Sequence, residues 1–71
     1  MATPKYQKFA ENIRDIVQNA KPGNAFSLSA LSIEALTNYG VGEKTLLRLL
    51  ANYEKQKKIL INQQDDNFEI V

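Results

Sequence analysis

The chain has 71 residues, a length that fits one small domain, and it contains neither cysteine nor histidine. Disulfides, thiolate metal sites, imidazole ligands and the commonest general base are therefore excluded. Nine lysines and arginines against eight aspartates and glutamates give a net charge of +1, which is too small to indicate nucleic-acid binding by itself.

The first predicted helix covers residues 4–20. Thr3 is a suitable N-cap, and Pro4 suits the first helical position, where its missing N–H costs nothing. Apolar residues then recur at steps of three and four, the spacing of one buried helical stripe. The stripe consists of Tyr6, Phe9, Ile13, Ile16, Val17 and Ala20. Pro22 and Gly23 predict a turn after this helix.

The second helix is predicted over residues 31–39. The segment before it alternates in polarity around Phe26, and either a short strand or an extended entry to the helix fits this pattern. Three serines are candidate N-caps, namely Ser27, Ser29 and Ser32. The expected buried face consists of Leu31, Ala35, Leu36 and Tyr39. Gly40 is expected to end the helix with a positive φ.

The third helix is predicted over residues 43–56. Its expected buried stripe consists of Leu46, Leu49, Leu50 and Tyr53. Its other face presents Lys44, Arg48, Asn52 and Lys55. Glu43 at its start, and Lys57 and Lys58 just beyond its end, suit the dipole of the helix.

A β-hairpin is predicted over residues 59–71. β-Branched residues come first, a polar stretch over residues 63–67 follows, and the alternating segment 68–71 ends the chain. The expected inward-facing residues are Ile59, Ile61, Phe68 and Ile70. The turn has several plausible centres, so the register stays open. The rival prediction is a plain three-helix bundle with a disordered tail after Ile61.

The segment 31–53 resembles a helix-turn-helix unit. Gly40 matches the glycine of the turn, Val41 the residue that plugs the core, and Gly42 the cap of the following helix. With the hairpin as the wing, the chain resembles the winged helix-turn-helix superfamily from Phe26 onward. The resemblance implies a mainly α fold with a small antiparallel hairpin, in which three helices and a C-terminal wing form one domain over residues 1–71.

This resemblance implies binding of double-stranded DNA, with the third helix in the major groove, in transcription or in DNA replication and maintenance. The expected DNA contacts are Lys44, Thr45, Arg48, Asn52, Lys55, Lys57 and Lys58. Two features depart from the family pattern. Gly42 replaces the usual serine or threonine cap, and Leu47 with Ala51 makes an apolar spot on the DNA face. The acidic wing tip, Asp65 and Asp66, is expected to stay clear of the duplex.

The apolar spot supports an alternative function, a winged-helix protein–protein interaction module or an accessory subunit of a larger complex. Catalysis is not expected, because the only paired carboxylates, Asp65 and Asp66, lie in an apparent exposed turn and no histidine activates a serine. No cofactor or metal is expected. The start of the chain is polar and no run approaches a membrane span, which favours a cytoplasmic protein. A monomer is favoured over a homodimer.

Overall fold

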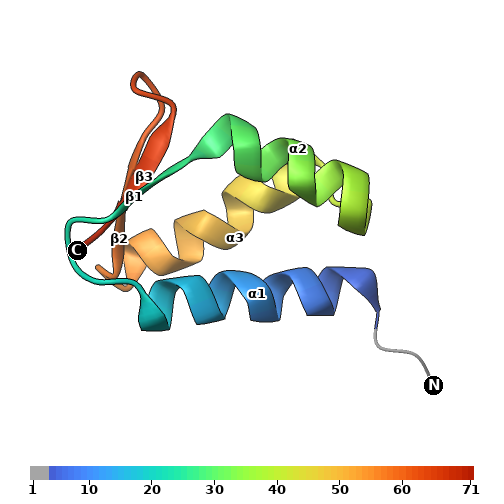
Figure 1. The fold of residues 1–71 in the computed structure, drawn as a ribbon, viewed down its shortest axis with the longest axis horizontal. Helices are drawn as coiled ribbons and strands as arrows, with labels where there is room; N and C mark the ends of the chain where they lie inside the picture. Colours follow the sequence, from blue (N-terminus) through green and yellow to red (C-terminus); the bar gives the residue numbers. More distant parts are fainter. Residues whose placement is uncertain (1–3) are drawn as a thin grey trace.

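The computed structural model describes residues 4–71, in which three helices lie beside a small three-stranded antiparallel sheet (Figure 1). The helices are α1 (Lys5–Asn19), α2 (Leu28–Tyr39) and α3 (Glu43–Lys55). The strands are β1 (Ala25–Ser27), β2 (Ile59–Asn62) and β3 (Asn67–Ile70). This mainly helical architecture confirms the predicted fold class, and its order of elements is compatible with a winged helix.

The sheet has the strand order β1-β3-β2, so the last strand of the chain is the central one. Its register places Ile59 opposite Ile70 and Ile61 opposite Phe68. Directly opposed residues share a face of the sheet, so the prediction that these four apolar residues face the same side is confirmed, and the structure fixes the register that the sequence left open. The short strand around Phe26 is also present and pairs with β3. The rival prediction of a disordered tail is wrong, because the hairpin completes the core.

The helix boundaries agree with the sequence to within one residue except at the start of α2. Ser27 is the N-cap of this helix, and its hydroxyl accepts a hydrogen bond of 3.2 Å from the backbone N–H of Ala30. Helix α2 therefore begins three residues before the predicted start. Pro4 is the N-cap of α1 rather than its first residue, because its ψ of 142° is extended. The predicted cap Thr3 lies outside the described residues.

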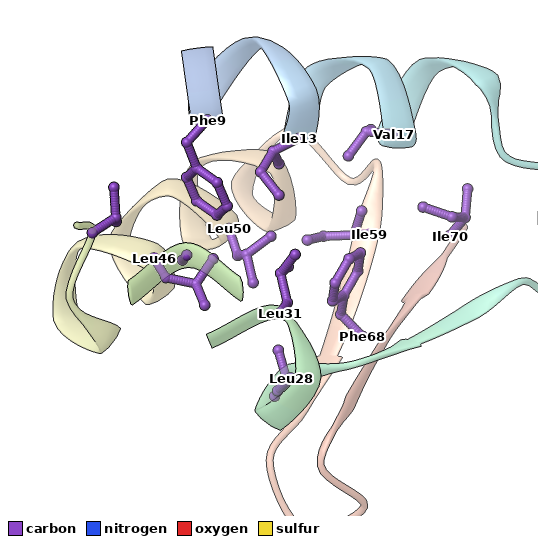
Figure 2. Packing of buried hydrophobic residues seen from close by; sticks show 12 residues of the cluster. Phe9, Ile13, Val17, Leu28, Leu31, Leu46, Leu50, Ile59, Phe68 and Ile70 are labelled. Carbon is purple, nitrogen blue, oxygen red and sulfur yellow. The ribbon is translucent and has the colours of Figure 1, made fainter. Parts of the chain in front are cut away.

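The hydrophobic core lies where the three helices meet the inner face of the sheet (Figure 2). Its buried members from α1 and α2 are Phe9, Ile13, Val17, Leu28, Leu31 and Ala35. The rest come from the inter-helix turn, α3 and the hairpin, namely Val41, Leu46, Leu50, Ile59, Phe68 and Ile70. Among residues 4–71 no polar or charged side chain is buried. Burial of apolar surface is therefore the main stabilising contribution to this core.

Two residues expected in the buried stripes are instead exposed. Tyr6 is 47% exposed, because the core begins one turn later, at Phe9. Leu36 is 64% exposed, because the buried face of α2 passes through Leu31 and Ala35 and each helical residue turns by about 100°. Tyr39 does pack inward, with its ring centroid 5.2 Å from that of Phe9.

Candidate nucleic-acid interface

The turn between α2 and α3 sets the position of the candidate DNA-binding helix. Gly40 has a φ of 64°, the left-handed conformation that the sequence predicted for this glycine. The N–H of Val41 then donates to the carbonyl of Ala35 over 2.9 Å, and the Val41 side chain is buried. Gly42 caps α3 without a side-chain hydrogen bond. Val41 thus anchors the turn in the core, whereas Glu43, Lys44 and Thr45 at the start of α3 are exposed.

The predicted contact residues of α3 are all exposed to solvent. They are Lys44, Thr45, Arg48, Asn52 and Lys55. Leu46 and Leu50 are buried on the opposite side of the same helix. The helix therefore has one apolar face in the core and one face with cations and short hydrogen-bonding side chains in solvent, as the sequence predicted for this element.

Leu47 and Ala51 lie between these two faces and are half-buried. Both line an open groove of about 620 Å³ between α3 and the hairpin. Lys44 and Arg48 lie on the α3 side of this groove, and Ile61 lies on the hairpin side. The apolar spot predicted on the DNA face is thus directed partly toward the hairpin, and the two cations border it.

Glu54 connects the end of α3 to the hairpin, a contact that sequence reasoning missed. The backbone N–H of Ile61 donates to Glu54 Oε2 over 2.9 Å. Because β2 is an outer strand, an N–H on its open side would otherwise lack a partner in the sheet. The contact fixes the hairpin against α3. The sequence did not predict this hydrogen bond, because Glu54 lies in a helix and Ile61 in a strand, and no periodic pattern connects the two residues.

Lys57 and Lys58 lie apart from Lys44 and Arg48, beyond the C-terminal end of α3. They line a depression with Pro22 and Val71 rather than the groove beside Arg48. Lys57 has a φ of 61°, and this left-handed residue directs the chain from the helix into β2. The structure therefore groups Lys44 and Arg48 but does not bring Lys57 and Lys58 to them.

The hairpin turn holds the two aspartates through local hydrogen bonds. Asn62 Nδ2 donates to Asp65 Oδ2 over 2.9 Å, and the N–H of Asp65 donates back to the Asn62 side chain over 3.2 Å. Asp66 lies at the N-terminus of α2, with its Oδ2 3.4 Å from the N–H of Ser29. A carboxylate is favourable at that end of a helix dipole. Both aspartates remain exposed, so the turn is acidic at its surface.

Other kinds of site have little support within residues 4–71. That part of the chain has no cluster of three or more acidic side chains that could hold a metal ion. Its helices include none that is both long enough and apolar enough to cross a membrane.

Comparison of the chain with family models, with curated proteins and with solved structures gives no match.

Proposed function

We propose that this protein binds duplex DNA, without catalysis, through the exposed face of α3. The observation that carries the proposal is the placement of three cations, Lys44, Arg48 and Lys55, on one solvent-exposed side of this helix. Thr45 and Asn52 flank them with short side chains that can hydrogen-bond to base edges. This combination suits a helix that reads bases while neighbouring cations contact phosphates.

The dimensions of the face fit a major groove. Lys44 and Lys55 are eleven residues apart, which corresponds to about 16 Å along a helix. The major groove of B-DNA is about 12 Å wide and admits an α-helix. Cations at the two ends of the face can therefore reach phosphates on either side of the groove. The α3 N-terminus precedes these residues and is free of the core, as Glu43 and Lys44 are both exposed.

Two placements strengthen this proposal beyond what the sequence offered. Leu47, which argues against DNA when it is assigned to the contact face, is half-buried among α3, α2 and the hairpin. Asp66, which would repel phosphates at a free wing tip, is placed at the N-terminus of α2. The hairpin turn still presents an acidic surface, so we expect the wing to stay outside the DNA contact.

A salt titration of duplex binding tests the proposed face. Three phosphates, neutralised by Lys44, Arg48 and Lys55, predict that affinity falls about 40-fold between roughly 50 and 200 mM salt. Five phosphates, with Lys57 and Lys58 included, predict a fall of about 500-fold over the same range. Fluorescence anisotropy with a labelled random duplex measures this slope. A fall in affinity near the five-phosphate value would contradict the proposal that Lys57 and Lys58 lie outside the DNA contact.

Charge-reversal variants locate the contact independently. The double variant Arg48→Glu and Lys55→Glu is expected to abolish duplex binding, because it places two carboxylates against the phosphates. The matched double variant Lys57→Glu and Lys58→Glu makes the same change in net charge and is expected to retain most of the affinity. Far-ultraviolet circular dichroism verifies that both variants fold. Equal loss of binding in the two variants would show that only net charge matters.

A protein-interaction role is the second candidate function. Ile33 is 67% exposed and Leu36 is 64% exposed, which are large values for apolar side chains one turn apart on one helix. Ile33 also lines a groove together with Leu47. An accessory subunit or docking module would use this apolar surface for a partner. The substitution Ile33→Asp is expected to abolish such docking and to leave binding by the α3 cations unchanged.

A further inference from the structure

The surface where α2, α3 and the hairpin meet has an apolar centre. Leu47 is half-buried on α3, and Ile33 lies across from it on α2, where it is 67% exposed. Both side chains line an open groove of about 400 Å³ whose floor includes Leu28 and Leu46. The remaining wall is polar and uncharged except for two carboxylates. The groove therefore combines an apolar floor with an acidic border.

The charges around Leu47 differ from one side to the other. Glu43 and Asp66 line the groove that runs toward α2. Lys44 and Arg48 line the second groove, which runs along α3 beside the hairpin. Leu47 lines both grooves and is the apolar residue that they share. This surface is therefore an apolar centre with carboxylates on one side and cations on the other.

The second groove contains one carboxylate of its own, and its hydrogen bond orients it. Glu54 lines this groove, but its Oε2 accepts the N–H of Ile61 over 2.9 Å. This bond holds the Glu54 side chain against β2. Lys44 and Arg48 have no such backbone contact with the hairpin among the hydrogen bonds of residues 4–71. The Glu54 carboxylate keeps its charge, but Lys44 and Arg48 outnumber it, so this side of the surface has a net positive charge.

We propose that two copies of this chain pair through this surface, across a two-fold axis that passes near Leu47. A two-fold interface brings one surface patch against itself, so the patch must be self-complementary. Here the axis places Glu43 and Asp66 of one copy opposite Lys44 and Arg48 of the other, and apolar side chains meet in the middle. A partner of a single charge sign would be attracted by one half of this surface and repelled by the other half.

Pairing has a consequence for the α3 face. It covers Lys44 and Arg48, two of the three cations that the proposed function assigns to DNA. Self-association and DNA binding would then exclude each other, so the dimer would be the form that does not bind DNA. The dimer itself does not rest on the proposed function, and it is tested without DNA. It departs from the monomer that was expected from the sequence.

Sedimentation velocity without DNA tests the pairing. We expect a reversible monomer–dimer equilibrium between about 10 µM and 1 mM protein, because a contact centred on two apolar side chains and a few charges belongs to the weak, transient class of protein–protein contacts. Leu47→Asp and Ile33→Asp are each expected to give a monomer over the whole range. Leu60→Asp is the matched control, because Leu60 is a 56% exposed apolar residue on β2 outside both grooves, and it is expected to dimerise normally.

A charge exchange distinguishes this geometry from general stickiness. Glu43→Lys and Arg48→Glu are each expected to weaken the dimer about tenfold or more, because each places like charges across the axis. The double variant restores opposite charges and is expected to recover most of the affinity. A monomeric wild-type chain at the highest concentration would overturn the pairing and leave the DNA proposal standing. Failure of the double variant to recover, with each single variant weakened, would overturn the two-fold arrangement.

Discussion

The left-handed residue at the end of α3 provides a precise test of the structure. Lys57 has a φ of 61°, and its N–H donates to the carbonyl of Glu54 over 2.9 Å. The N–H of Lys58 donates to the carbonyl of Tyr53 over 3.1 Å. These two bonds form the Schellman ending of a helix, in which glycine usually occupies the left-handed position. Lysine at this position is therefore strained, and Lys57→Gly should stabilise the fold.

The expected size follows from two opposing effects. Left-handed backbone costs a non-glycine residue about 1–2 kcal/mol. Glycine itself lowers the free energy of unfolding by about 0.5–1 kcal/mol, because it loses more conformational freedom on folding than other residues do. Lys57→Gly is therefore expected to raise the free energy of unfolding by about 0.5–1 kcal/mol and the Tm by about 2–8 °C for a domain of this size. Thermal and urea denaturation followed by circular dichroism measure both quantities.

Lys58→Gly is the matched control for this prediction. It removes the same charge one residue later, where φ is not positive, so only the entropic cost of glycine remains. We expect this control to lower the free energy of unfolding by about 0.5–1 kcal/mol. The sign of the effect should thus reverse between neighbouring lysines. A Lys57→Gly variant no more stable than the Lys58→Gly variant would refute the assigned conformation of the helix end.

The remaining predictions concern other positions that hold the elements together, and chemical denaturation measures each of them. Gly40→Ala is expected to cost about 0.5–1 kcal/mol, because the backbone strain exceeds the entropy that alanine saves and the space around this glycine is open; a stabilising result would contradict its left-handed conformation. Ser27→Ala removes the cap of α2 and is expected to cost about 1 kcal/mol, whereas Ser29→Ala, which removes no cap hydroxyl, should be nearly neutral. Phe68→Ala is expected to cost about 3–5 kcal/mol, because the side chain is fully buried on the central strand; a cost under about 1 kcal/mol would contradict its place in the core.

The sequence by itself determined the features that depend on neighbouring residues. The steps of three and four between Phe9, Ile13 and Val17 predicted the buried face of α1, and all three are in the core. Gly40 predicted the end of α2 and the sharp turn before α3. The exposed cations of α3 follow from the same periodicity, because a helix places every third or fourth residue on one side. Local spacing and turn chemistry were sufficient for these parts.

Only the tertiary structure decided the features that depend on contacts between elements. Leu36 is exposed because the sheet and α1 determine which side of α2 is covered, and the apolar pattern of α2 alone allowed a broader face. The Glu54 contact with Ile61 and the place of Asp66 at the N-terminus of α2 arise from docking of the hairpin. Lys57 is separated from Arg48 because α3 ends between them. Contacts between distant residues leave no periodic pattern in a single sequence, and the folded chain alone brings those residues together.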